Sequence, residues 1–394
     1  MKSALLLSLL AVSVSAAVAA PVNDPSWPMY QGNAQHDGFV DRDLMSNPGG
    51  TIEWFSSPST LHYSGVAVGG GYIFLTTNAL FDSNNAVIAL LFADGTEAWR
   101  QTFPNAFTVN PPAYDDVNDL VYLQTCNHSG DTWLHRLDIA TGSALAALPF
   151  EAQWEWYQAP TLIDGQVYIN GGYYGGMYAF DPVAGTESWY ASLPQYDQWT
   201  PSQYGDDKLV TWTDKITISD RATGAEVDTI ANPVGEWGNF VPHAVAVSGD
   251  IGYVVGDGML HAYDLAAGEV AWSTPDIQAM WQPATDGKAV AVIVNAALQF
   301  RDPADGSLLW EWQPDNYSIG TQVILFRNHA VVRSLDDTVL IDRRTHQEVK
   351  RWPVAGKMAY ADNHLIVVDE DGVNTGQVTS ILLRSTPFIS NGFE

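Results

Sequence analysis

The sequence predicts an all-β protein folded as an eight-bladed β-propeller of four-stranded blades, closed by N- and C-terminal strands that share one blade. Three observations predict this fold. A short phrase containing Asp, Gly and Trp recurs along the chain, its glycines repeat roughly every 40 residues, and half of the phrase stands alone near the N-terminus. A repeat of this length, built from several short strands, is typical of propeller blades.

The recurring phrase is an apolar strand, an Asp, three residues, a Gly, three residues and often a Trp. Asp side chains bond turn amides and Gly adopts left-handed backbone angles, so each Asp-x-x-x-Gly predicts the turn between the third and fourth strands of a blade. The Trp then lies on the outer strand and covers the gap to the neighbouring blade. The residues given these structural roles are Asp138, Asp181, Asp220, Asp264, Asp302 and Asp342, then Gly95, Gly142, Gly185, Gly224, Gly268 and Gly306, then Trp54, Trp99, Trp189, Trp272 and Trp310.

The spacing of the phrase gives the number of blades. Successive glycines are 47, 43, 39, 44 and 38 residues apart, and the segments between them are short, rich in Val, Ile, Tyr and Trp, and broken by turn residues. Helical repeats of similar length are excluded by this pattern. Seven phrases lie inside the chain, and residues 50–54 supply a fourth strand for the strands near the C-terminus. Joining the two ends makes the eighth blade and removes the open edge.

The chain divides into four predicted segments. Residues 1–19 have the basic start, apolar middle and Ala-x-Ala end of a signal peptide, which predicts an exported, periplasmic or extracellular protein. Residues 20–50 form an opening segment, residues 51–384 the propeller, and residues 385–394 a mobile tail. No later segment is apolar enough to span a membrane. The single cysteine, Cys126, excludes an intrachain disulfide, so the core must supply the stability.

The charge balance restricts the partners. With 45 acidic and 17 basic residues the formal net charge is −28, which disfavours nucleic acid, anionic membranes and anionic polysaccharides. A protein partner or a neutral glycan remains, and we expect a monomer. Motif searches predict no catalytic residues and no metal site: there is no nucleophile elbow, no phosphate loop and no pair of histidines at metal-ligand spacing.

Aromatic residues recur just before the first strand of several predicted blades. Because those strands begin on one face around the central channel, the aromatics are candidates for a ligand-binding ring suited to neutral sugars or a peptide. The alternative is that they pack between blades and contact no ligand. The candidate ring consists of Trp154, Trp156, Trp199, Trp237 and Trp281, with His243 as a polar neighbour.

The repeated phrase resembles the PQQ-like repeat, named for pyrroloquinoline-quinone enzymes. Residues 26–38 resemble the Trp-x-x-x-x-Gly-Asn-x-x-x-x-Gly opening of that family, and the resemblance covers roughly residues 26–385. It implies an eight-bladed propeller, in agreement with the count above. The repeat serves both in quinoprotein dehydrogenases and in BamB-like assembly scaffolds. The dehydrogenases carry two adjacent cysteines under the cofactor, whereas this chain has one cysteine in total.

Three functions are therefore weighed. The favoured one is an exported, non-catalytic binding or scaffold protein that holds a protein partner or a neutral glycan at the channel face and needs no cofactor. The second is a quinoprotein oxidoreductase that uses PQQ with calcium. The third is an envelope assembly subunit resembling BamB.

Overall fold

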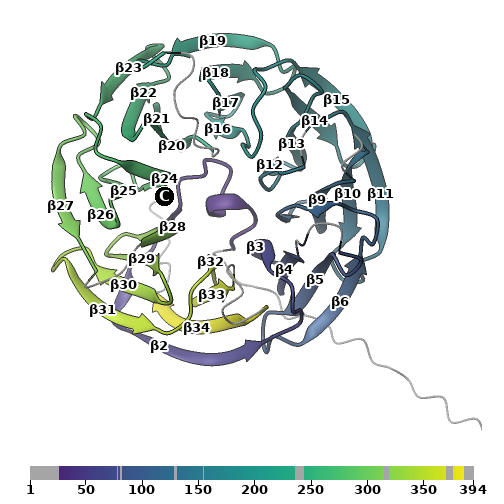
Figure 1. Ribbon diagram of the computed structural model, residues 1–394, viewed down its shortest axis with the longest axis horizontal. Helices are drawn as coiled ribbons and strands as arrows, with labels where there is room; N and C mark the ends of the chain where they lie inside the picture. Colours follow the sequence, from purple (N-terminus) through teal and green to yellow (C-terminus); the bar gives the residue numbers. More distant parts are fainter. Residues whose placement is uncertain are drawn as a thin grey trace, which may run out of the picture.

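The computed structural model describes residues 26–77, 79, 82–127, 131–153, 155–235, 244–314, 319–369 and 376–385. The predicted signal peptide and all but the first residue of the predicted tail lie outside these ranges. Eight sheets are arranged as a closed ring around a central axis, which confirms the predicted eight-bladed propeller (Figure 1). The described helical structure is one 3-10 turn, η1 (Tyr30–Gly32), and no described helix has the length and hydropathy of a transmembrane span.

We number the blades in chain order and give their strands from the innermost outward. Blade 1 is β3 (Tyr63–Gly69), β4 (Tyr72–Thr77), β5 (Ala86–Leu91) and β6 (Glu97–Thr102); blade 2 is β7 (Thr108–Val109) with β8 (Ala113–Asp115), β9 (Leu120–Cys126), β10 (Thr132–Asp138) and β11 (Ala144–Phe150); blade 3 is β12 (Thr161–Ile163), β13 (Gln166–Asn170), β14 (Met177–Asp181) and β15 (Thr186–Ala191); and blade 4 is β16 (Ser202–Tyr204), β17 (Lys208–Trp212), β18 (Lys215–Asp220) and β19 (Glu226–Ala231).

The second half of the ring repeats this plan. Blade 5 is β20 (Ala246–Ser248), β21 (Ile251–Gly256), β22 (Met259–Asp264) and β23 (Glu269–Ser273); blade 6 is β24 (Ala279–Thr285), β25 (Val290–Val294), β26 (Ala297–Arg301) and β27 (Leu308–Trp312); blade 7 is β28 (Ile319–Phe326), β29 (His329–Ser334), β30 (Thr338–Asp342) and β31 (Gln347–Trp352), with β1 (Phe39–Val40) on the channel side; and blade 8 is β32 (Lys357–Ala361), β33 (His364–Val368), β34 (Val378–Ser385) and β2 (Leu44–Ser56).

Blade 8 closes the ring as predicted. Its outer strand β2 comes from the N-terminal part of the chain and runs antiparallel to β34, with Ile52 opposite Ile381. Strand β2 begins at Leu44, inside the segment predicted as the opening, because the pairing continues past the half-phrase at residues 50–54. The sheet of every blade is thereby packed between two others, so no blade face is left uncovered by a gap in the ring.

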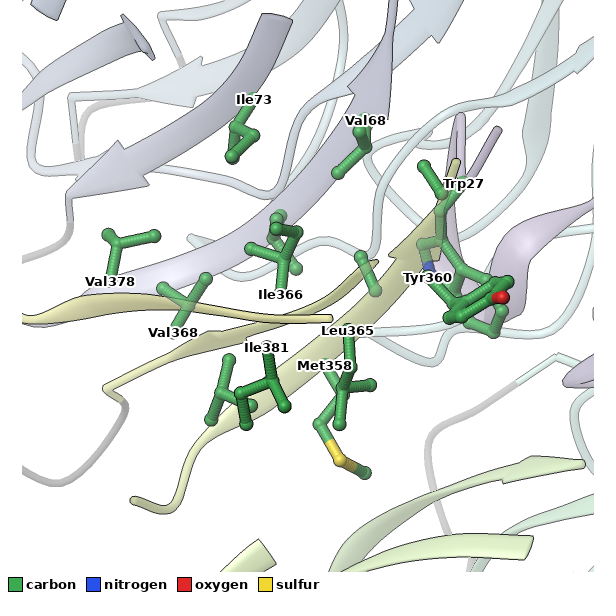
Figure 2. Close-up of a cluster of buried hydrophobic side chains, with 14 of the residues drawn as sticks. Trp27, Val68, Ile73, Met358, Tyr360, Leu365, Ile366, Val368, Val378 and Ile381 are labelled. Carbon is green, nitrogen blue, oxygen red and sulfur yellow. The ribbon is translucent and has the colours of Figure 1, made fainter. Parts of the chain in front are cut away.

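The hydrophobic core lies between the blades. The apolar side chains of each sheet alternate between its two faces, and each face packs against the facing side of the next blade. Figure 2 shows part of the cluster between blades 8 and 1, where Ile366, Val368 and Ile381 lie among buried aliphatic side chains. Trp27 of the opening segment belongs to the same cluster, so the N-terminal segment is anchored in the core.

The Asp-x-x-x-Gly phrases form the turns before the outer strands. The Asp181 carboxylate accepts hydrogen bonds from the amides of Val183 and Ala184. The Gly185 amide donates to the Asp181 carbonyl at 2.8 Å. Gly185 has a φ of +66°, the left-handed angle that the turn requires. His346, which takes the glycine position in blade 7, has a φ of +62°.

Tryptophans on the outer strands join neighbouring blades. The Trp99 indole of blade 1 lies over Gly142 of blade 2 and donates to the Ile139 carbonyl at 2.6 Å. Trp352 of blade 7, which does not stand at the phrase position, covers Gly50 of blade 8 in the same way and donates to its carbonyl at 2.7 Å. These contacts seal the outer rim of the ring.

Candidate functional site

Residues 27–38 of the opening segment cross the central channel and are bound to the blades through their backbone. Their carbonyls accept hydrogen bonds from the innermost strand of six blades in turn, at 2.7–3.0 Å. The six donor–acceptor pairs are Val68 to Trp27, Tyr114 to Pro28, Gln203 to Ala34, Val247 to Gln35, Thr285 to Asp37 and Leu325 to Gly38. The purple N-terminal segment in the middle of Figure 1 shows this course. The channel is therefore obstructed by the chain's own N-terminal region.

The Trp-x-x-x-x-Gly-Asn-x-x-x-x-Gly opening explains how this segment fits. A side chain at Gly32 would put its Cβ 2.7 Å from the Trp27 ring, and Gly32 has a φ of +87°. A Cβ at Gly38 would lie 2.9 Å from Ala284 and 3.0 Å from the Val323 carbonyl, with a φ of +67°. Only glycine lets the backbone approach these surfaces in that conformation.

A cavity of about 230 Å³ lies on the axis above the opening segment, and we call it the axial cup. Its floor is formed by Trp27, Tyr30 and Gln31. Its wall comes from the beginnings of the innermost strands and the residues just before them, in seven of the eight blades. The wall residues are Ser64, Gly65, Val66, Pro111, Gln158, Ala159, Gln198, Trp281, Thr321, Gln322, Lys357 and Met358. Residues 236–243, before blade 5, lie outside the described residues.

Gln31 is the least satisfied polar residue in the axial cup. Its side chain is 1% exposed, and neither its Oε1 nor its Nε2 has a hydrogen-bond partner among the described residues. A buried amide atom without a partner costs roughly 1–3 kcal/mol. Gln322 across the cup is different, because its amide exchanges two hydrogen bonds with the Met358 backbone, at 2.7 and 2.9 Å.

Three cup residues have strained backbones. Gln31, Gln198 and Trp281 have φ values of +55°, +57° and +65°, in the left-handed region that these residue types rarely adopt. Such a conformation costs roughly 1–3 kcal/mol per residue and is typical of sites where side-chain position matters more than stability. Trp281 lies in an irregular stretch of β24, between Met280 and Ala284, where the pairing with β25 shifts.

Two titratable residues lie beneath the floor. Complete burial lowers the pKa of His36 to about 4, and its Nδ1 lies 2.6 Å from the Tyr30 carbonyl oxygen. Burial raises the pKa of Asp37 to about 6, although its Oδ1 accepts the Phe39 amide at 2.8 Å. At neutral pH the imidazole is therefore uncharged, and the charge of the floor rests on Asp37.

The described lining of the cup is nearly free of charge. It contains four glutamines, one cation, Lys357, and no carboxylate. Asp197 adjoins the lining residue Gln198, and burial raises the pKa of its carboxyl. Among the described residues there is also no group of three or more His, Cys, Asp or Glu side chains that could hold a metal ion. This arrangement can accept hydrogen-bonding, uncharged groups and an apolar face.

The candidate aromatic residues occupy different environments. Trp281 lines the cup. Trp199 is 1% exposed in the core beside blade 3, where its indole donates to the Tyr196 carbonyl at 2.9 Å. Trp156 is half-buried, and its carbonyl accepts the Gln198 amide at 3.3 Å. Trp154, Trp237 and His243 lie outside the described residues.

Sequence reasoning missed the floor and the glutamines of the cup. The opening motif was visible, but nothing in it indicates that its backbone crosses the channel. A second signal was available, because glutamines stand beside several of the aromatic positions, as in Tyr157-Gln158 and Trp281-Gln282. Gln282 itself is buried and has a structural contact, since its Oε1 accepts a hydrogen bond from the Ala244 amide at 3.1 Å.

Comparisons with known proteins agree with this architecture. A family model described as outer membrane protein assembly factor BamB, built on the PQQ-type repeat, matches residues 43–199 and 212–349. No curated relative matches the chain in sequence.

Solved structures extend the comparison at the level of the fold. BamB from Moraxella catarrhalis is similar with a TM-score of 0.66 at 16% identity, over 85% of this chain and 100% of that one. A europium-containing methanol dehydrogenase has a TM-score of 0.67 at 11% identity, over 91% and 98%. The quinohemoprotein alcohol dehydrogenase ADHIIG from Pseudomonas putida HK5 has 0.66 at 12%, over 94% and 82%.

Proposed function

Because the chain belongs to the PQQ-type repeat family described as outer membrane protein assembly factor BamB, we propose that it is an exported, non-catalytic binding protein that holds a neutral glycan or a segment of a partner protein in the axial cup. The observation that carries this proposal is the chemistry of the cup, which is lined by glutamine side chains and aromatic rings. Sites of this kind bind uncharged groups through hydrogen bonds and ring contacts. The signal-peptide pattern of residues 1–19 supports export.

The donor set argues against PQQ in the cup. The quinone bears three carboxylates and is held with calcium, so its site needs several cations and carboxylate ligands for the metal. The described lining supplies one cation and no carboxylate. The single cysteine, Cys126, is buried in blade 2 and has no adjacent cysteine with which to form a bridge. These residues do not fit the cofactor, and our proposal includes no redox step.

Tryptophan fluorescence of the mature protein tests the proposal. We would titrate neutral oligosaccharides, uncharged peptides and PQQ with calcium in parallel, using wild type, Trp281→Ala and Trp133→Ala. Trp133 is a matched control because it is partly exposed on β10 and absent from the cup lining. We expect a neutral ligand to give a saturable signal that Trp281→Ala weakens and Trp133→Ala leaves unchanged. Saturation by PQQ alone would overturn the proposal.

An aromatic hairpin favours a second use of the same protein, as an assembly subunit. Tyr173 and Tyr174, between β13 and β14, are 50% and 75% exposed. The hairpin is held in place, because the Tyr190 hydroxyl donates to the Gly175 carbonyl at 2.8 Å and the Gly172 amide donates to Glu151. Rigid exposed tyrosines are typical of protein interfaces. If this use is correct, Tyr173→Ala/Tyr174→Ala removes a co-purifying envelope protein that Trp281→Ala retains.

A further inference from the structure

We infer that residues 171–176 of blade 3, which we call the tyrosine hairpin, bind arginine side chains of a partner protein. This inference rests on the assembly use proposed above and narrows it, since it names the chemistry that the partner presents. Three features carry it: two exposed rings on a fixed loop, acidic side chains beside them, and the absence of Lys and Arg from this part of the chain.

Glycines fix the tyrosine hairpin and leave its two rings in solvent. A Cβ at Gly172 would lie 2.7 Å from the Tyr190 hydroxyl, and a Cβ at Gly176 would lie 2.4 Å from the Tyr190 ring, so only glycine allows the loop to pack this closely. Tyr173 and Tyr174 are 50% and 75% exposed, and their rings pack edge to face with centres 4.8 Å apart. The two rings therefore form a small, ordered aromatic surface that a ligand can reach.

Acidic side chains lie beside this surface, at the seam between blades 2 and 3. The Glu151 carbonyl accepts the Gly172 amide, which joins it to the hairpin. The Glu151 side chain is exposed, and its carboxylate has no hydrogen bond or ion pair among the described residues. Burial raises the pKa of Tyr178 to about 12, and the charges of Glu151 and Glu187 add to this effect, so both carboxylates lie near its hydroxyl. The Tyr178 ring in turn packs on Tyr190, with centres 4.7 Å apart.

This part of the chain supplies no positive charge of its own. Residues 137–207, which include all of blade 3, contain no Lys or Arg and nine acidic residues. The acidic residues are Asp138, Glu151, Glu155, Asp164, Asp181, Glu187, Asp197, Asp206 and Asp207. In blade 4 the chain provides a cation for an aromatic ring, because Lys208 Nζ lies 5.6 Å from the Tyr204 ring centre. Among the described residues no cation lies over Tyr173 or Tyr174, so we expect the partner to supply one.

Arginine is the side chain that suits both parts of this surface. Its planar guanidinium stacks on aromatic faces, is weakly hydrated, and donates two parallel N–H groups to a carboxylate. The lysine ammonium is more strongly hydrated and cannot stack in this way. A second copy of this chain is a poor partner, because its net charge of −28 would repel the same acidic surface.

Isothermal titration calorimetry with short peptides tests the inference. The probes are acetylated, amidated Gly-Arg-Gly-Arg-Gly, the same peptide with lysine, and the same peptide with uncharged citrulline. Because the whole protein is acidic, any cationic peptide is attracted to it, so the preference for arginine separates ring stacking from general attraction. We expect the arginine peptide to bind about fivefold more tightly than the lysine peptide and at least about tenfold more tightly than the citrulline peptide. Equal affinities for the arginine and lysine peptides would overturn the inference.

Substitution of the rings connects this preference to the tyrosine hairpin. Tyr173→Leu/Tyr174→Leu keeps much of the apolar surface but removes the aromatic faces, so the preference for arginine should disappear. Tyr173→Phe/Tyr174→Phe keeps the faces and should bind like wild type. Tyr204→Leu is the matched control, because the Tyr204 ring already has Lys208 over it. A folded leucine pair that keeps the wild-type preference would contradict the inference.

Substitution of the carboxylate separates a local ion pair from the overall charge. Glu151→Gln and Glu226→Gln change the net charge equally, and both glutamates are exposed, but Glu226 begins the outer strand of blade 4. Glu151→Gln should weaken the arginine peptide about threefold or more, whereas Glu226→Gln should leave it within about twofold of wild type. Equal losses in the two variants would show attraction by the overall charge alone and would overturn the inference.

The inference and the assembly use fail in different ways. If Tyr173→Ala/Tyr174→Ala removes a co-purifying envelope protein but the peptides show no preference for arginine, the inference is wrong and the assembly use stands. Neutral oligosaccharides that bind in place of the arginine peptide, and that the leucine pair no longer binds, would also overturn the inference. If the alanine pair removes no protein and no peptide binds, both are wrong.

Discussion

The rim and the axial cup of this propeller use the same backbone conformation in opposite ways. At the rim, the left-handed positions of the turns are occupied by glycines such as Gly142 and Gly224, and the indoles that cover them have hydrogen-bond partners. In the cup, the left-handed positions are occupied by Gln31, Gln198 and Trp281, and the Gln31 amide has no partner among the described residues.

The difference shows which region is built for stability. At the rim turns that carry glycine, local preference, packing and polar satisfaction agree, as expected of residues that specify a fold. In the cup these levels conflict at Gln31, Gln198 and Trp281, which line one cavity. Conflicts of this kind persist where a site needs its groups held in place. The variants below test this contrast, from the largest expected effect to the smallest.

Gly142→Ala should cause the largest loss of stability. The new Cβ would lie 2.3 Å from Cε3 of Trp99 and would adopt a φ of +68°, so the alanine is strained and the indole must also move. We expect a loss of about 3–5 kcal/mol in the free energy of unfolding, measured by urea titration with tryptophan fluorescence.

Gly185→Ala is the matched control for that prediction. Blade 2 places no tryptophan over this turn, and a Cβ at Gly185 meets nothing within 4 Å, while its φ of +66° is nearly the same. Only the backbone strain remains, so we expect a loss of about 1–2 kcal/mol. Equal losses at Gly142 and Gly185 would mean that the tryptophan cover contributes nothing to the rim.

Asp37→Asn should change how stability depends on pH. Burial raises the pKa of Asp37 to about 6 in the folded protein, against about 3.8 for the ordinary carboxyl, so folding favours the protonated form. The favourable contribution is complete below pH 3.8 and is lost as the pH rises through 6. Relative to Asp37→Asn, wild type should therefore lose up to about 3 kcal/mol between pH 4 and 7.

The neighbours of Asp37 are retained in that comparison. The charge of Asp286 raises the pKa of Asp37, and Asp286 itself forms an ion pair with Arg343 at 2.9 Å. His36 has the opposite dependence, since its pKa is lowered to about 4 and protonation below pH 6.5 destabilises the fold. His36 is present in both proteins, so its effect cancels. A pH-independent difference in urea midpoint would contradict the prediction.

The sequence predicted the rim well because the rim is made of local signals. An Asp and a Gly four residues apart define a turn, and a Trp four residues later lies on the following strand, so the repeat and the closed ring follow from spacing. Trp352 was missed because it stands two residues beyond the phrase position, on the same face of β31.

The cup was predicted less well because its parts come together only in three dimensions. Trp199 and Trp281 both stand two residues before a proline, yet Trp199 is buried in the core and Trp281 lines the cup. The spacing before the proline predicts on which face of the propeller a tryptophan lies, but it does not predict how deeply its side chain is buried. The floor depends on backbone carbonyls such as those of Ala34 and Gln35, which carry no residue-specific signal.

Trp352→Phe should lower the free energy of unfolding more than Trp310→Phe does. The two variants compare the two kinds of tryptophan contact at the rim. Trp352 is buried and donates to the Gly50 carbonyl at 2.7 Å, so phenylalanine leaves that carbonyl without its donor. Trp310 instead stacks on His346 with ring centres 4.3 Å apart, a contact that phenylalanine largely keeps. In urea titrations we expect the free energy of unfolding to fall by about 1–2 kcal/mol in Trp352→Phe and by less than about 1 kcal/mol in Trp310→Phe. The reverse order would show that stacking on His346 is the stronger seal.

The smallest effect is expected in the cup, and its sign should be opposite to that at the rim. Gln198 has a φ of +57°, so Gln198→Gly relieves strain and should stabilise the protein by about 0.5–1 kcal/mol. Gln158 lines the same wall without a left-handed angle, so Gln158→Gly should destabilise it by a similar amount, because glycine only increases the entropy of the unfolded chain. Differential scanning calorimetry measures the melting temperatures of the two variants. Their difference separates the relief of backbone strain at Gln198 from the general effect of introducing a glycine into the wall. If both variants lower the melting temperature, the left-handed glutamines are not strained, and the contrast between cup and rim reduces to the unpartnered amide of Gln31.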